Sequence, residues 1–235
     1  MKIAAEQVDI NCPESEIYNR LLSLDNKHIL ELGCGHAEIT RNIATSGANR
    51  KITALEVDEI AHEKNLQISD LPNVNFILAG AQQIPLEDES VDIVFMFKSL
   101  HHVPMDLMEA SMHEIKRVLK PGGFAYISEP VFAGDYNEIL RLFNDEKIVR
   151  EAAFNTLKKV VNEGLFKLVE EVFFNSPRKY ENFTQFEKRT IRATHSNYQL
   201  DDDLYALVKQ RFEQHIGDDG AHFLNPIRVD LLRRE

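Results

Sequence analysis

The segment Ile29–Glu38 constrains the fold of this chain more than any other stretch of its sequence. It begins with Ile29–Leu32, a short run that is apolar apart from Glu31 and reads as a buried strand. A turn with Gly33 and Gly35 follows at once, and the next residues have helical spacing. Because neither glycine carries a side chain, a ligand can approach the bare backbone there. The segment predicts a strand–turn–helix unit with a ligand at the turn.

An acidic residue follows this turn at the spacing found in nucleotide-binding folds. Lys51–Glu56 is a second strand-like run, and it places Glu56 about twenty positions after the turn. Together the two features predict a nucleoside-binding crevice at the carboxyl edge of a parallel sheet. The third glycine of a Gly-x-Gly-x-x-Gly fingerprint is replaced by Glu38, whose charge repels a pyrophosphate at a helix N-terminus. A nucleoside ligand without phosphate therefore fits better than a dinucleotide.

Strand-like and helical runs alternate from residue 29 to residue 128. We expect strands over 29–32, 52–56, 74–78, 92–97 and 124–128, and helices over 37–45, 58–66 and 105–119. The last of these helices repeats Met105, Met108 and Met112 on a core face, and Lys120–Gly123 is expected to stop it. This alternation predicts an α/β fold with a doubly wound, mostly parallel, Rossmann-like sheet of about seven strands, and helices on both faces.

The flanking segments follow a looser pattern. A helix over 15–24 is expected to begin at Ser15 as its N-cap. Beyond Pro130 we expect extra helices near 136–143, 148–162, 180–193 and 200–216, and strands over 165–174 and 223–232. No repeat or linker divides the 235 residues, so we expect one domain over 1–235. Within it, 28–130 forms the ligand-binding core, and we expect 1–27 and 131–222 to cover the ligand site.

Composition narrows the range of partners. The 27 Lys and Arg against 38 Asp and Glu give a net charge of −11, which argues against a nucleic-acid partner. Two cysteines, Cys12 and Cys34, form no disulfide framework. The sequence shows neither a signal peptide nor a membrane span, so we expect a soluble, cytoplasmic protein without a membrane partner. Nothing in the sequence indicates the oligomeric state.

Three segments give the chain a resemblance to class I S-adenosylmethionine-dependent methyltransferases of the small-molecule type. The resemblance spans roughly residues 28–130 and is carried by Ile29–Gly35, by Asn73–Phe76 through Ile84–Leu86 with Phe97–Val103, and by Glu114–Phe124. The first segment is shared with many nucleotide binders. The third, just before the fifth expected strand, is much more specific. Their order and spacing together make the resemblance strong.

The resemblance implies S-adenosyl-L-methionine as the cofactor. Gly33, Cys34 and Gly35 would pass under its ribose and methionine portion, and Glu31 would lie near its ammonium group. Glu56 would accept both ribose hydroxyls, because a carboxylate offers two acceptor oxygens to a vicinal diol. Family members more often carry Asp at this position, and Glu is an accepted variant.

Further positions concern the adenine and the methyl group. Val57 would pack on the adenine, and the backbone N–H of Ala81 would face its edge. Many members have an Asp that accepts a hydrogen bond from the adenine amine where this chain has Gly80, so Gln82 would substitute through its side-chain oxygen. Lys98 stands where many members have a small or apolar residue, and we count it among the cofactor-binding residues.

The candidate catalytic residues follow the fourth strand. Methyl transfer needs mainly in-line positioning, and an acceptor that loses a proton needs a base nearby. His101 and His102 are the candidates for that base, although either one could instead cap or pack in the loop. Lys98 either orients an acidic acceptor or pairs with a neighbouring carboxylate. Glu129 ends the fifth strand and either points into the crevice or has a positioning role before Pro130.

Three further arginines and two histidines lie in the variable region. Arg141, Arg178 and Arg192 bind either an acidic substrate or surface carboxylates. His195 and His222 lack metal-ligand spacing, so no metal site is predicted.

The sequence therefore predicts methyl transfer from S-adenosylmethionine to a small-molecule acceptor of unknown identity. The acidic charge and the absence of an Asn/Asp-Pro-Pro-Tyr motif after the fourth strand favour this acceptor class, while a protein or peptide acceptor stays open. One alternative is a non-catalytic module that binds the cofactor as a structural or sensing ligand. The other, which Glu38 disfavours, is an NAD-dependent oxidoreductase.

Overall fold

The computed structural model of the chain describes residues 1–192 and 198–235. Its centre is a sheet with strand order β3-β2-β1-β4-β5-β8-β6, and the short strand β7 pairs with β8. The strands are β1 His28–Leu32, β2 Lys51–Glu56, β3 Val74–Leu78, β4 Val91–Phe97, β5 Leu119–Pro130, β6 Lys167–Tyr180, β7 Ile216–Gly217 and β8 Gly220–Arg233. Strands β1 to β5 pair in parallel, and β8 runs antiparallel to both β5 and β6. The predicted doubly wound, mostly parallel sheet is confirmed.

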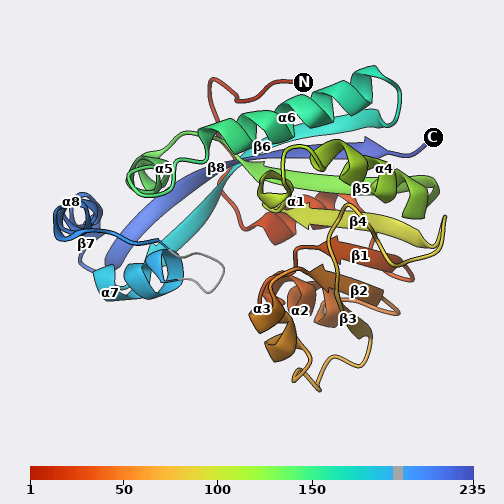
Figure 1. Cartoon of the computed structure of the whole chain (residues 1–235), viewed down its shortest axis with the longest axis horizontal. Helices are drawn as coiled ribbons and strands as arrows, with labels where there is room; N and C mark the ends of the chain where they lie inside the picture. Colours follow the sequence, from red (N-terminus) through yellow and green to blue (C-terminus); the bar gives the residue numbers. More distant parts are fainter. Residues whose placement is uncertain (193–197) are drawn as a thin grey trace.

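Helices cover both faces of this sheet (Figure 1). They are α1 Glu14–Leu21, α2 Glu38–Thr45, α3 Glu59–Asn65, α4 Met108–Val118, α5 Asp135–Leu140, α6 Lys147–Asn162, α7 Phe183–Phe186 and α8 Asp202–Glu213. Because successive strand residues point to opposite faces, Ile29 packs in a core with α1 and α2, whereas Leu30 packs in a core with α4 and α6. No helix among the described residues has the length and apolarity needed to cross a bilayer.

A third apolar cluster lies where β6 and β8 extend past the rest of the sheet (Figure 1). We call this part the arm; it comprises α5, α7, α8 and the outer ends of β6 (176–180) and β8 (220–226). Tyr180 and Phe186 meet edge to face with ring centroids 5.4 Å apart, and Phe212 and Phe223 join them. This packing gives the arm an aromatic core of its own beside the carboxyl ends of β4 and β5.

Three of the predicted element boundaries are wrong in the first half or at the middle of the chain. The first helix begins at Glu14, after Pro13 as its N-cap, so Ser15 is not the cap. Helix α4 begins at Met108 and leaves Met105 exposed outside it, while Met108 and Met112 lie in the core as expected. Residues 120–123 belong to β5 instead of forming a stop. They stay extended because Gly122 and Gly123 exchange backbone hydrogen bonds with Arg234.

The predicted helix over 180–193 is also wrong in part. Tyr180 ends strand β6, where it pairs with Ala221 of β8, and the helical residues begin only at Phe183. A π-helical turn, Glu187–Ile191, continues them. The last residue of the predicted helix lies outside the described residues, as does His195.

Candidate active site

The sheet has a topological switch point between β1 and β4. The chain leaves β1 toward α2 on one face and leaves β4 toward α4 on the other, although the two strands are neighbours. Ligands of open α/β sheets bind in the crevice that such a switch point creates at the carboxyl ends of the strands. The residues predicted as site residues all lie in or after β1 to β4 near this edge: Glu31, Gly33, Cys34, Gly35, Glu56, Val57, Ala81, Gln82, Lys98, His101 and His102.

The two glycines of the turn are required for different reasons. Gly33 has a φ of +77°, and a Cβ added to it would lie 2.8 Å from the Cβ of Ser99. Ser99 itself is fixed, since its Oγ donates to the carbonyl of Leu32 at 2.7 Å. Gly35 has a φ of +54°, but a Cβ there would meet nothing within 4 Å. Gly33 is therefore needed for packing, whereas Gly35 borders open space that a ligand can fill.

Glu56 holds its carboxylate directly against this turn. One oxygen, Oε2, accepts the backbone N–H of Gly35 at 2.5 Å. The other, Oε1, accepts the N–H groups of Val57 and Asp58 at 2.8 and 2.9 Å. These bonds fix the side chain, which is 7% exposed, and leave lone pairs on both oxygens for a diol. Val57 lies next to it with 68% of its surface exposed, an apolar platform suited to an adenine ring.

Glu31 is buried beneath the turn. Its Oε2 accepts the Thr40 hydroxyl at 2.7 Å. Burial raises the pKa of Glu31 to about 8, so this carboxyl is mostly protonated at neutral pH unless a cation lies beside it. Cys34 is buried as well, and burial raises the pKa of its thiol, which makes it an unreactive packing residue. The arrangement suits a ligand ammonium near Glu31.

Gln82 occupies the space left by the missing side chain of residue 80. A Cβ built on Gly80 would lie 2.3 Å from Oε1 of Gln82 and 2.7 Å from its Nε2. The amide of Gln82 therefore folds back over the backbone at the position where an Asp side chain would begin. The amide oxygen of Gln82 is thus an acceptor beside Gly80, and together these residues fit an adenosyl ligand.

Lys98 pairs with a carboxylate of the protein. It follows β4 in the left-handed region, with a φ of +57°. Its ammonium donates to buried Glu14 of α1. Of the two alternatives for Lys98, pairing with a neighbouring carboxylate is the one observed, and α1 thereby contributes to the site.

A pocket of about 160 Å³ opens beyond Lys98, between the ends of β4 and β5 and the arm. Its polar lining consists of Lys98, His101, His102, Asn137, Glu146, Arg150, Arg178 and Asn225. Its apolar lining includes Pro130, Val131, Ala133, Leu140, Pro226 and Ile227, together with the ring of Tyr136. An apolar wall with a few convergent polar groups is typical of small-molecule sites.

His101 is held by a buried carboxylate at one end of its ring. Its Nδ1 lies 2.5 Å from Oε2 of Glu129, whose Oε1 accepts the N–H of Leu100 at 3.0 Å. Burial disfavours the charged imidazole, but the Glu129 and Glu146 carboxylates outweigh it and raise the pKa of His101. An Nδ1–H donated to Glu129 leaves Nε2 as the nitrogen available to a substrate. The positioning role of Glu129 is thus observed, and it acts on His101.

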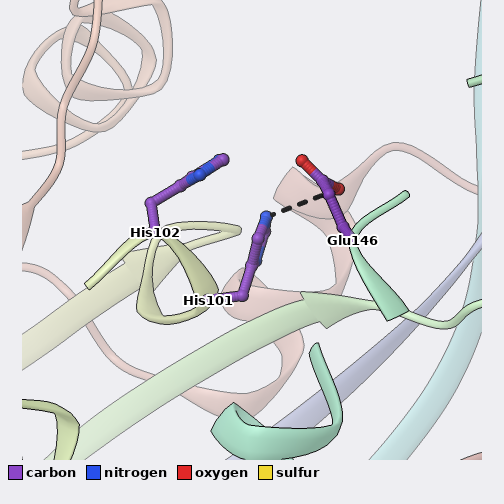
Figure 2. Close-up of side chains that lie close together, drawn as sticks. All are labelled: His101, His102 and Glu146. Carbon is purple, nitrogen blue, oxygen red and sulfur yellow. Dashed lines mark ion pairs between the residues drawn. The ribbon is translucent and has the colours of Figure 1, made fainter. Parts of the chain in front are cut away.

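His101, His102 and Glu146 form a compact cluster at the pocket wall (Figure 2). Their ligand-type atoms lie within 4.8 Å of one another, and Nε2 of His101 is 3.8 Å from Oε2 of Glu146. The same Oε2 accepts two hydrogen bonds from Arg150, at 2.5 and 3.1 Å. These groups could hold a divalent cation, but the guanidinium charge opposes one there, so we interpret the cluster as an acid–base network.

Sequence reasoning found His101 and Lys98 but missed Glu146, Arg150 and the two buried amides Asn137 and Asn225. No local pattern marks those residues, because each reaches the pocket only through tertiary packing. His222, in contrast, lies at the surface and pairs with Asp219 at 2.9 Å.

Known proteins with related sequences and structures place this site in a family. A family model described as "Methyltransferase domain" matches residues 29–123. The chain is 34% identical to a probable phthiotriol/phenolphthiotriol dimycocerosates methyltransferase of Mycobacterium ulcerans, over 74% of this chain and 64% of that protein. It is 31% identical to an O-methyltransferase of Aspergillus nomiae, over 66% of this chain and 71% of that protein.

The fold has a close counterpart among solved structures. The YcgJ protein of Bacillus subtilis superposes with a TM-score of 0.65 over 94% of this chain and 97% of that one, at 14% sequence identity. The chain spans about a third to two thirds of the length of the first curated relatives that it matches. The sequence matches and the shared sheet architecture show that this chain belongs to the class I S-adenosylmethionine-dependent methyltransferases.

Proposed function

We propose that this protein transfers the methyl group of S-adenosylmethionine to a small molecule held in the pocket. The observation that carries the proposal is the proximity of two features at one sheet edge. One is an open glycine turn with the Glu56 carboxylate against it, and the other is the pocket beyond Lys98. The relatives include a sterol methyltransferase, a probable phthiotriol methyltransferase and an O-methyltransferase, and these names support a small-molecule acceptor.

The cofactor would lie along the carboxyl ends of β1 to β3. Its ribose hydroxyls would bond to Glu56, its ammonium would lie near Glu31, and Val57 would pack on the adenine. Gln82 and the N–H of Ala81 would recognise the edge of that ring. When bound there, the sulfonium supplies an electrophilic methyl group.

His101 would act as the proton acceptor. Nε2 of His101 would take the proton that the acceptor's oxygen or nitrogen loses on methylation. Glu129 holds Nδ1–H and stabilises the resulting imidazolium, while Lys98 and His102 border the reacting atoms. S-adenosylhomocysteine is then released with the methylated product.

Incubation with methyl-labelled cofactor and fractionated small-molecule extracts tests the proposal. We expect transfer of label to a small molecule together with formation of S-adenosylhomocysteine. For an acceptor that loses a proton, His101→Gln should lower kcat about 10²- to 10⁴-fold without weakening cofactor binding. His222→Gln is the matched control, because His222 lies at the surface, where it pairs with Asp219, and its replacement should leave kcat unchanged.

A different result would identify the alternatives. Cofactor binding without label transfer to any fraction would favour the non-catalytic sensing module. If His101→Gln were as active as the wild type, His101 would not be the proton acceptor.

A further inference from the structure

The structure separates the three arginines that the sequence left equivalent. All three are exposed, but Arg141 pairs with Glu138 at 3.2 Å and Arg192 pairs with Glu187 at 2.8 Å. Arg178 forms no ion pair with any carboxylate in the described part of the chain, and it lines the pocket. Only Arg178 therefore remains a candidate for binding an acidic substrate.

Arg178 is positioned by the arm. Its guanidinium lies 5.0 Å from the centroid of the Tyr136 ring, and Nη1 donates to the Tyr136 hydroxyl at 3.4 Å. A guanidinium stacked on an aromatic face loses little freedom when it binds a second partner, because its orientation is already restricted. The Tyr180 hydroxyl also contacts this guanidinium, and no carboxylate of the described residues pairs with it.

The remaining charges around the pocket are balanced within the protein. Lys98 pairs with Glu14, His101 pairs with Glu129, and Arg150 pairs with Glu146. Each of these cations therefore has a carboxylate of the chain itself as its counter-ion. Among these groups, the Arg178 charge is the one that lacks compensation, so the pocket is complementary to a ligand with a single negative charge.

Two buried amides of the pocket wall provide an independent observation. Nδ2 of Asn137 and Oδ1 of Asn225 have no hydrogen-bond partner among the described residues, although the two side chains are only 5% and 8% exposed. Arg178 pairs in register with Phe223, two residues before Asn225, so Arg178 and Asn225 share one face of the sheet. Unsatisfied buried polar atoms are costly, which favours a polar ligand that bonds to them.

We propose that the methyl acceptor carries a carboxylate that Arg178 binds in the arm-side half of the pocket. The guanidinium fork matches two carboxylate oxygens, and Nδ2 of Asn137 adds a further donor. Oδ1 of Asn225 accepts a hydrogen bond from a hydroxyl or amine of the same ligand. The apolar wall, with Leu140 and Ile227, holds the body of the acceptor. A carboxylate fits better than a phosphate monoester, which carries more than one negative charge at neutral pH.

This inference rests on the proposed function, and calorimetry with defined probes tests it. Benzoate, benzamide and phenyl phosphate are titrated into the full chain saturated with S-adenosylhomocysteine. We expect benzoate to bind about tenfold more tightly than neutral benzamide and more tightly than phenyl phosphate. Arg178→Gln should lower the affinity for benzoate about tenfold. Arg192→Gln removes the same charge from a surface pair and should change nothing.

Absence of benzoate binding, equal affinity for benzamide, or an equal loss in Arg192→Gln would overturn the inference. Tighter binding of phenyl phosphate would replace the carboxylate by a phosphate. Affinity for S-adenosylhomocysteine, measured for every variant, verifies folding. If the wild type fails to bind that nucleoside, the proposed function fails instead.

Discussion

At the scale of single residues, Glu31 has the most unusual environment near the glycine turn. Burial raises its pKa to about 8, so the carboxyl carries a proton at pH 7. The ammonium of S-adenosylmethionine beside it would favour the ionised form and expel that proton. We expect cofactor binding at pH 7 to release most of one proton, which calorimetry in buffers of different ionisation enthalpy measures. Glu31→Gln should abolish the release; proton release that persists in this variant would contradict the assignment.

His101 makes the stability of the fold depend on pH. Its pKa in the folded chain is raised above the ordinary 6.5, since the Glu129 and Glu146 carboxylates outweigh the effect of burial. The folded state therefore holds the proton more tightly than the unfolded chain does. This contribution is complete below pH 6.5 and is lost as the pH rises through the raised pKa.

The prediction is checked by urea unfolding of wild type and His101→Gln over a series of pH values. The free energy of unfolding of the wild type should exceed that of the variant most at the acidic end, and the difference should shrink as the pH rises. The rate of methyl transfer should change in the opposite direction, because the proton acceptor must be neutral. A stability difference that does not vary with pH would show that His101 does not titrate as stated.

The sequence predicts site residues that belong to a recognisable motif, but it does not predict residues that reach the site only through tertiary packing. Glu56 and His101 were found because each follows a recognisable strand. Glu146 caps α6 and Arg150 lies in its first turn, far along the chain from His101. The packing of α6 against the turn that holds His101 brings both residues to the pocket. The role of Lys98 could not be predicted for the same reason, because its ion-pair partner, Glu14 of α1, lies far away in the sequence.

At the scale of elements, the turn after β1 offers a matched pair of substitutions. Gly33→Ala introduces a Cβ 2.8 Å from the Cβ of Ser99 in a left-handed conformation, so it should destabilise the fold by about 1–3 kcal/mol. Gly35→Ala has the same type of φ but meets open space, so its cost should be about 1 kcal/mol. The added methyl would, however, occupy cofactor space.

Thermal unfolding and cofactor titration of both variants check this prediction. Gly33→Ala should have the lower melting temperature, whereas Gly35→Ala should show the larger loss of affinity for S-adenosylhomocysteine relative to its loss of stability. Equal affinity of Gly35→Ala and wild type would place the cofactor elsewhere.

The predictability of the elements follows their burial. The boundaries of strands β1 to β4 agree with the prediction to within a residue. Strands β1, β2 and β4 lie inside the parallel sheet and are mostly buried, whereas β3 lies at its edge and is marked by its apolar residues alone. Strands β6 and β8 extend farther than predicted, since their outer ends mix polar residues with Pro177 and Pro226 and gain their order from pairing with each other. Long-range pairing of this kind leaves no local pattern.

At the scale of the whole molecule, distant segments assemble the proposed active site. The core 28–130 provides the glycine turn, Glu56 and the loop after β4. The N-terminal segment contributes Glu14, and α6 and the arm complete the pocket. We propose accordingly that residues 1–27 and 131–222 act as the acceptor-side part of a single domain, while the strand order of the sheet places cofactor and acceptor in adjoining halves of one crevice.

We propose that the glycine turn and Glu56 together bind the adenosyl group. Calorimetric titration of S-adenosylhomocysteine into wild type, Glu56→Ala and the exposed control Glu59→Ala tests this binding site. Glu56→Ala should lose about 2–4 kcal/mol of binding free energy, because two charge-assisted hydrogen bonds to the ribose disappear. Glu59→Ala should bind as the wild type does. Undiminished affinity of Glu56→Ala would show that the ribose does not lie at Glu56.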